Sequence, residues 1–240
     1  MKILSIGNSF STDAHRYLYR LARLNGVEMK TVNLTIGGCD LETHWKNAKE
    51  NNAFYDMETN GDNPVEGIGI SEALISDKFD IITLQQASRL SGIHDSVQPY
   101  LTDLVGFIKE YQPQAKLYYH QTWAYEIDTA HTGFLSYDSD QIKMYNCIKE
   151  TAHKVAESIN AAVIPTGDVI QKLRTLKEFD YTNGGLSLCR DGYHLSNDYG
   201  RFAASATWLR TFTGKQIICN NFDDLDCELI KLILNTVNDI

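Results

Sequence analysis

The chain has 240 residues, of which 43% are hydrophobic and 22% are charged. This composition supports a buried core and is unlike that of a disordered or fibrous chain. The formal net charge of −9 repels phosphate backbones and anionic membranes, which argues against nucleic-acid or membrane-surface partners. The most basic group recurs at helical spacing, which predicts a solvated helix face rather than an anion site. Its members are His15, Arg16, Arg20 and Arg23.

In chain order, short apolar runs alternate with longer segments of helical period, which is typical of a parallel sheet covered by helices on both faces. Turn residues at 60–64 predict a loop over residues 52–66. No linker is apparent, so we expect one domain spanning residues 1–240. The predicted elements are strand 2–6, helix 12–25, strand 28–34, loop 52–66, strand 79–84, helix 96–111, strand 116–120, helix 139–159, strand 161–165, helix 198–213 and helix 224–237.

The sequence carries no metal or phosphate-loop motif. The seven histidines never pair at i, i+4, and neither glycine-rich phosphate pattern is present, so we expect no metal and no cofactor. Five cysteines without a C-x-x-C spacing favour a reduced compartment. An apolar run begins directly after Met1 and Lys2, so we expect a cytoplasmic protein, secreted only if a leader has been removed. No run approaches the roughly 20 apolar residues of a membrane helix.

The first predicted strand ends in Gly7-Asn8-Ser9-Phe10-Ser11. Ligands of open parallel sheets bind at the carboxyl ends of the strands, and Gly7 permits a tight turn there. Ser9 would lie near the unpaired N–H groups of the next helix, which favour an oxyanion. The segment alone favours a plainer interpretation, in which Ser9, Ser11, Thr12 or Asp13 is a helix N-cap.

A second motif lies near the other end of the chain, at Arg190-Asp191-Gly192-Tyr193-His194. Asp191 and His194 are three residues apart in a turn, so the carboxylate can hold one imidazole nitrogen while the other faces a serine. Together with Ser9 they predict a triad: Ser9 as nucleophile, His194 as base and Asp191 as the residue that fixes the tautomer. His120 is a weaker candidate base because no carboxylate is close to it in sequence.

These two motifs resemble the first and last blocks of the SGNH/GDSL hydrolases, G-D-S-L or G-N-S-x and D-x-x-H. The resemblance spans nearly the whole chain. It implies a three-layer α/β/α sandwich with about five parallel strands wound as in flavodoxin, in a single SGNH-hydrolase-like domain. It also implies an esterase without a cofactor.

The two middle blocks are less regular. The family has a glycine after the second strand whose N–H joins the oxyanion hole, and Ile36-Gly37-Gly38-Cys39 stands there. Gly38 is the preferred donor, Gly37 is the alternative, and a plain turn is a third interpretation. After the third strand the family shows G-x-N-D, where this chain has Leu84-Gln85-Gln86-Ala87-Ser88. This departure resembles a divergent branch of the superfamily, the DUF4886-type proteins.

Without that asparagine, we expect the amide of Gln86, or else of Gln85, to donate to the oxyanion together with Ser9 and Gly38. Both glutamines could instead satisfy only backbone groups at the strand end. Aromatic and amide side chains near the strand ends suit a polar, ring-shaped substrate, although Trp123 could equally belong to the core. Glu126 and Asp128 follow closely in sequence, but a glycosidase needs a further acid on the opposite side of a cleft. The sequence does not provide one. The candidate substrate contacts are Gln85, Trp123 and Tyr193.

The sequence therefore predicts hydrolysis of a small O-acyl ester, such as an acetyl group, on a small molecule or carbohydrate. Its oligomeric state is left open. One alternative is a catalytically silent module that holds a sugar or nucleotide in the same cleft. Another is a flavodoxin-like nucleotide binder that takes phosphate at the first turn.

Overall fold

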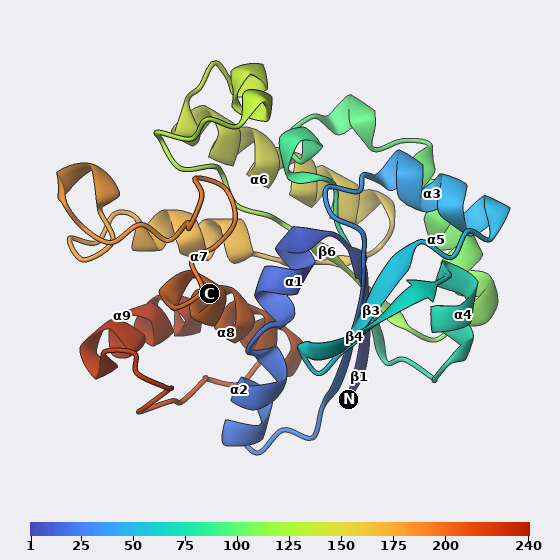
Figure 1. Ribbon diagram of the computed structural model, residues 1–240, viewed down its shortest axis with the longest axis horizontal. Coiled ribbons are helices and arrows are strands. Elements are labelled where there is room, and N and C mark those ends of the chain that lie inside the picture. The colour runs from blue at the N-terminus through green and yellow to red at the C-terminus, as the bar shows by residue number, and fades with distance from the viewer.

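A seven-stranded sheet forms the middle layer of the protein, as the computed structural model in Figure 1 shows. The structure describes residues 1–240 except for the side chain of residue 63. The strand order is β4-β3-β2-β1-β5-β6-β7. The strands are β1 (Lys2–Gly7), β2 (Lys30–Thr35), β3 (Tyr55–Thr59), β4 (Asp62–Ile68), β5 (Ile81–Leu84), β6 (Lys116–His120) and β7 (Ala162–Ile164).

Five of these strands are parallel and occur in the order β2-β1-β5-β6-β7. This is the flavodoxin-like order, second-first-third-fourth-fifth, so the predicted fold class and winding are confirmed. Each of the five overlaps a predicted strand, because buried parallel strands are short apolar runs. The direction of winding reverses between β1 and β5, where ligands bind in open α/β sheets.

Residues 52–66 are not the loop that was predicted. They contain most of the antiparallel hairpin β3–β4, which adds two strands to the β2 edge of the sheet. Asn60 and Gly61 both have positive φ, 57° and 81°, as a two-residue type I′ hairpin turn requires. The turn residues were therefore identified correctly, but they join strands. The flanking strands carry many polar residues, which hid them from a search for apolar runs.

Helices cover both faces of the sheet (Figure 1). In the part of the chain that the structure describes, every helix is too short or too polar to span a bilayer. One face carries α1 (Ser9–His15), α2 (Leu18–Leu24), α7 (Thr166–Leu173), α8 (Tyr199–Thr213) and α9 (Cys227–Asn238). The other carries α3 (Leu41–Glu50), α4 (Ile70–Ile75) and α5 (Tyr100–Tyr111), and α6 (Gln141–Ser158) contributes to both cores. Short 3₁₀ helices occur at Ser88–Leu90, His94–Ser96, Thr132–Tyr137 and Tyr181–Asn183.

The predicted helix 12–25 is two helices, α1 and α2, and it begins earlier than expected. The Ser205 hydroxyl of α8 accepts from Tyr17 N at 3.2 Å and donates to Ala14 O at 2.7 Å. A side chain inserted into the helical hydrogen-bond ladder in this way breaks the helix. Of the predicted basic helix face, Arg16, Arg20 and Arg23 are exposed as expected. His15 is the exception, because it is buried and its Nε2 lies 2.7 Å from Ser5 Oγ. Helices α3, α4 and α7 were not predicted.

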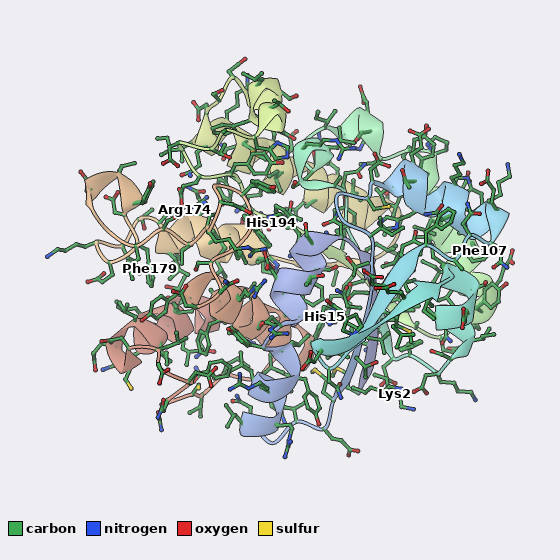
Figure 2. The ribbon with its side chains drawn as sticks, in the orientation of Figure 1. Lys2, His15, Phe107, Arg174, Phe179 and His194 are labelled. Carbon is green, nitrogen blue, oxygen red and sulfur yellow. The ribbon has the colours of Figure 1, made fainter. Side chains whose placement is uncertain are left out.

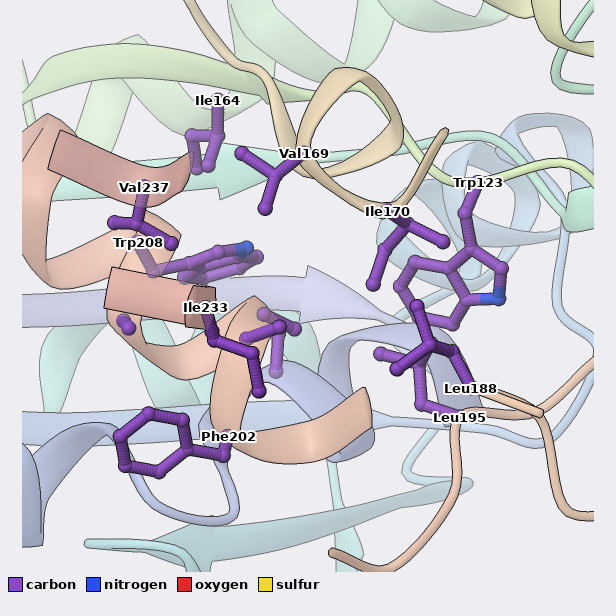
Figure 3. Close-up of a cluster of buried hydrophobic side chains, with 14 of the residues drawn as sticks. Trp123, Ile164, Val169, Ile170, Leu188, Leu195, Phe202, Trp208, Ile233 and Val237 are labelled. Atoms are coloured by element: carbon purple, nitrogen blue, oxygen red, sulfur yellow. The ribbon is translucent and has the colours of Figure 1, made fainter. Parts of the chain in front are cut away.

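The core between the sheet and the α1, α7, α8 and α9 layer is rich in aromatic side chains. Figure 3 shows Trp208 and Phe202 of α8 beside Ile233 of α9. Phe10, the residue after Ser9, stacks on Trp123 with ring centroids 4.2 Å apart and an interplanar angle of 12°. Such a pair contributes about 1 kcal/mol beyond its buried area. It anchors the first turn of α1, and therefore Ser9, in the core.

Candidate active site

The turn after β1 places Ser9 at the first position of α1. Asn8 is the N-cap, because its backbone is extended and its Oδ1 accepts from Phe10 N at 3.1 Å. The plainer interpretation, in which Ser9, Ser11, Thr12 or Asp13 caps this helix, is therefore wrong. The Ser9 hydroxyl is left for other contacts, beside the N–H groups of a first helical turn that have no partner within the helix.

Gly7 is required by packing rather than by the turn. A Cβ atom at this position would lie 2.5 Å from Ser11 Oγ and 3.2 Å from Gln85 Cδ. The glycine lets the segments after β1 and β5 approach each other closely. This approach brings together two strand ends that both border the site.

Ser9, His194 and Asp191 form a continuous hydrogen-bonded chain. Ser9 Oγ lies 2.8 Å from His194 Nε2, and His194 Nδ1 lies 2.7 Å from Asp191 Oδ2. A carboxylate can only accept, so Nδ1 carries the proton and Nε2 is free to accept one from Ser9. Figure 2 shows His194 beside the first turn of α1. The structure thus brings together the three residues that the sequence predicted as a triad.

Asp191 is held by its own turn as well as by the imidazole. Its Oδ1 accepts from His194 N at 2.8 Å and from Tyr193 N at 3.2 Å. Partial burial works to raise the pKa of the Asp191 carboxyl, but these bonds and the one from the His194 ring outweigh it and hold the pKa below its usual value. The carboxylate is therefore ionised at neutral pH, as orientation of the imidazole requires.

A buried carboxylate on α1 fixes the turn that carries His194. Asp13 Oδ2 accepts from Leu195 N at 2.9 Å, and its Oδ1 accepts from Arg190 Nη1 at 2.9 Å and Arg201 Nε at 2.8 Å. Asp13 is fully buried, so these partners are what make its charge tolerable. Asp13 lies one helical turn after Ser9 and positions the base against the nucleophile.

A pocket of about 300 Å³ opens over Ser9 and His194. Its volume is at the small end of the range for ligand sites, which suits a short substrate group. The carboxyl-end segments of several parallel strands meet there, as the fold predicts. Besides the serine and the histidine, the pocket is lined by Asn8, Phe10, Gly37, Gly38, Ser88, Arg89, His131 and Tyr193.

The glycine turn after β2 borders this pocket. Cys39 N donates to Ile36 O at 3.2 Å, and Gly38 has φ +66°, as the third residue of a type II turn requires. Arg89 holds the turn from the other side, with Nη1 donating to Gly38 O at 3.1 Å and Nη2 to Asp40 Oδ2 at 2.9 Å. Gly38 stays our predicted oxyanion donor, with Gly37 beside it.

Gln86 is not placed to donate to an oxyanion, which corrects the prediction from sequence. It is buried, and its Oε1 accepts from Leu41 N at 3.0 Å and Ala87 N at 2.8 Å. Its Nε2 donates to Ser96, to the carbonyl and the hydroxyl, both at 3.1 Å. The amide therefore joins the start of α3 to the segment after β5, and it satisfies backbone groups, as the plainer interpretation allowed.

Gln85 and Trp123 also lie away from the pocket, so their predicted substrate contacts are corrected too. Gln85 is buried, with Nε2 donating to Asn8 Oδ1 at 2.7 Å and Oε1 lying 2.9 Å from His120 Nδ1. Trp123 is buried in the core, and its indole nitrogen donates to Tyr193 O at 2.8 Å. Of the three predicted contacts, only Tyr193 lines the pocket.

His120 is likewise not a base for Ser9. It is fully buried, and its second ring nitrogen lies 3.0 Å from Thr166 Oγ1. Burial lowers its pKa to about 3, so the ring is neutral and structural. Its position at the end of β6 made it a candidate, but its side chain packs below the site.

Five lining residues were given no role in the predicted site: Asn8, Phe10, Ser88, Arg89 and His131. Ser88 and Arg89 belong to the segment after β5, and His131 belongs to the loop after β6. The rule that pointed to strand ends could have included them. Burial, followed by the charge of Arg89, lowers the pKa of His131, and its Nδ1 accepts from Gly133 N at 3.0 Å. The neutral ring therefore carries its proton on Nε2.

We predict that Gln86→Ala destabilises the fold by about 2–5 kcal/mol, because the buried N–H groups of Leu41 and Ala87 lose their acceptor. Urea unfolding followed by circular dichroism would measure the change. The surviving folded fraction should keep most of its activity per molecule. A fold as stable as the parent's, combined with a 100-fold loss of kcat, would restore Gln86 to the oxyanion hole.

Metal ligation is not a feature of the described side chains. They contain no group of three or more His, Cys, Asp and Glu residues that could hold a metal ion. The five cysteines are free thiols. Burial raises the pKa of Cys39 and Cys189 to about 12, so these two are protonated and unreactive at neutral pH.

Solved structures share this architecture across most of the chain. A protein from Slackia heliotrinireducens that is described as an SGNH hydrolase has a TM-score of 0.58 and 18% identity, covering 88% of this chain and 98% of that one. An acetyl-xylooligosaccharide esterase from Geobacillus stearothermophilus has a TM-score of 0.51 and 16% identity, covering 88% and 91%. The fold is therefore that of the SGNH hydrolases.

The chain belongs to the DUF4886 family, described as a domain of unknown function, whose model matches residues 2–229. A crystal structure of a DUF4886 family protein from Bacteroides uniformis has a TM-score of 0.92 and 36% identity, covering all of this chain and 93% of that one. None of the curated proteins matches the sequence. The predicted resemblance to the DUF4886-type proteins is thus confirmed.

Proposed function

We propose that the protein is a serine esterase in which Ser9 is the nucleophile, His194 the general base and Asp191 the residue that orients the imidazole. The observation that carries this proposal is the contact of 2.8 Å between Ser9 Oγ and His194 Nε2. These residues are 185 positions apart, and both line the same pocket. A nucleophile bonded to a base that a third group orients is the arrangement that acyl transfer requires.

In this mechanism Ser9 Oγ attacks the ester carbonyl while His194 Nε2 takes the hydroxyl proton. The carbonyl electron pair moves to oxygen, and the backbone N–H groups of Ser9 and Gly38 stabilise the resulting oxyanion. Each such donor contributes about 3 kcal/mol in the transition state. The tetrahedral intermediate expels the alcohol, which receives the proton from His194. Water then attacks the acyl-serine by the same steps and releases the acid.

The proposed substrate is a short O-acyl ester, such as an acetyl group, on a carbohydrate or other small polar alcohol. The pocket volume of about 300 Å³ limits the size of the acyl group. The rings of Tyr193 and His131, with centroids 4.8 Å apart, form a wall next to His194, where the leaving alcohol must receive its proton. Aromatic faces with polar tips suit the stacking and hydrogen bonding of a sugar ring.

A fluorophosphonate probe tests the proposal directly, because it phosphonylates only an activated serine. The parent protein should be labelled at Ser9, as mapped by peptide mass spectrometry, and should hydrolyse p-nitrophenyl acetate. The Ser9→Ala variant should show neither reaction. The alternative of a silent sugar- or nucleotide-binding module, motivated by the missing family asparagine, predicts an unlabelled parent protein. That result would exclude the esterase.

A further inference from the structure

The segment after β5 brings one side-chain hydroxyl, that of Ser88, into the pocket. Ser88 lines the pocket together with Ser9 and Gly38, and its Oγ lies 2.8 Å from the hydroxyl oxygen of Tyr125. We propose that Ser88 is the third oxyanion donor, in the place that the expected glutamine does not fill, and that Tyr125 orients it. This inference rests on the proposed esterase function and adds a catalytic residue to it.

The nearby amides are directed elsewhere. The side-chain nitrogen of Gln86 donates to Ser96, and that of Gln85 donates to Asn8, while both side chains are buried outside the pocket. Asn8 lines the pocket, but its amide nitrogen donates to Cys39 O at 2.9 Å. In the segment after β5, the Ser88 hydroxyl is thus the uncharged hydrogen-bond donor that lies in the pocket.

Arg89, the neighbour of Ser88, also lines the pocket but is held differently. Its two terminal nitrogens donate to Gly38 O and to the Asp40 carboxylate, at 3.1 Å and 2.9 Å. The guanidinium therefore supports the glycine turn, and the charge of Asp40 balances its own. A neutral hydroxyl next to this pair can approach a developing oxyanion without giving up a salt bridge.

The protons of the Ser88–Tyr125 pair determine which group donates into the pocket. Burial raises the pKa of Tyr125 to about 12, so its phenol is protonated at neutral pH. A hydroxyl has one proton and can accept two hydrogen bonds. When Tyr125 donates to Ser88 Oγ, the Ser88 proton is free to point at a substrate oxygen.

The Tyr125 ring is fixed, which holds its hydroxyl oxygen in place beside Ser88 Oγ. The side chain is fully buried, and its centroid lies 4.7 Å from that of His131 and 5.8 Å from that of Tyr193. A donor that is oriented before the reaction needs no reorganisation in the transition state, which is the source of oxyanion-hole catalysis. Two hydroxyl groups in series thus do what one amide does elsewhere in the superfamily.

The test compares Ser88→Ala with the parent on p-nitrophenyl acetate. Loss of one oxyanion donor should lower kcat by about 100- to 1000-fold with little change in KM. Ser88→Thr keeps a hydroxyl and should restore activity to within about 10-fold of the parent, and Tyr125→Phe should lower kcat by a smaller factor than Ser88→Ala. Ser91→Ala is the matched control, because Ser91 is a buried hydroxyl three residues away that does not line the pocket.

Phenylboronic acid provides a second readout, because its tetrahedral adduct with Ser9 places an oxygen in the oxyanion hole. Its inhibition constant should rise for Ser88→Ala and stay at the parent value for Ser91→Ala. If Ser88→Ala keeps the parent kcat while Ser9→Ala is inactive, Ser88 is not a donor and the esterase assignment stands. If the parent is neither labelled by fluorophosphonate nor active, both proposals are wrong.

Discussion

Substituting His194 by alanine should lower kcat for p-nitrophenyl acetate by about 10⁴- to 10⁶-fold, the loss expected when a serine hydrolase loses its base. The reason is geometric: His194 Nε2 is the hydrogen-bond partner that can take the Ser9 proton, at 2.8 Å. Asp191→Asn should cost about 10⁴-fold, because an amide in place of the carboxylate favours the wrong imidazole tautomer. Steady-state kinetics with purified variants measures both.

The double variant Ser9→Ala/His194→Ala gives a stricter test. Residues that act as one unit are not additive, so the double variant should be about as slow as either single variant. His153→Ala is a suitable control, because His153 is an exposed histidine of α6 outside the pocket. If the fold losses of kcat in the two single variants multiplied in the double variant, Ser9 and His194 would act independently. The assignment of a catalytic triad would then be wrong.

Acid should destabilise this protein progressively below about pH 6.5, because three of its histidines are buried in the neutral form. Burial lowers the pKa of His15, His44 and His120 to about 3, 4 and 3, from an ordinary value of 6.5. Below pH 6.5 these histidines bind protons in the unfolded chain but stay neutral in the folded chain. The free energy of unfolding therefore falls as the pH falls. By pH 5 each histidine removes about 2 kcal/mol, and three such losses rival a typical total stability.

Urea unfolding between pH 7 and pH 4.5 would measure this dependence. Stability should be flat near pH 7 and should fall steeply between pH 6.5 and pH 4. His44→Phe should reduce that slope by about one proton, whatever its stability at pH 7. A stability that is constant down to pH 4.5 would mean that the three buried rings accept protons in the folded state.

The structural features that depend only on neighbouring residues along the chain could be predicted from the sequence. The parallel strands are buried apolar runs, and the two turns at Ser9 and Asp191–His194 are local motifs, so both were found. The β3–β4 hairpin was missed because its strands are largely polar, although its Asn60-Gly61 turn was identified. The break between α1 and α2 depends on Ser205, which is 188 residues from the Tyr17 backbone that it contacts.

The identity of the oxyanion donor could not be predicted from the sequence either, because it depends on contacts between distant residues. Two adjacent glutamines offer equivalent chemistry, and the choice between them and Ser88 depends on which distant groups they meet. Gln86 finds a backbone N–H 45 residues away at Leu41, and Gln85 finds Asn8 at the end of another strand. Only the packed fold shows that these amides are occupied. The pocket-facing role of His131 is hidden for the same reason, since a long loop carries it there.

The position of Asp13 links assembly of the site to the cooperativity of folding. Any local opening that carries His194 away from Ser9 removes Leu195 N and Arg190 from a carboxylate that has no access to water. Such an opening leaves the buried Asp13 carboxylate with only some of its hydrogen-bond and ion-pair partners, which costs several kcal/mol. We therefore expect the amide of Leu195 to exchange its hydrogen as slowly as the core strands do. The nucleophile and its base would then separate only when the domain itself unfolds.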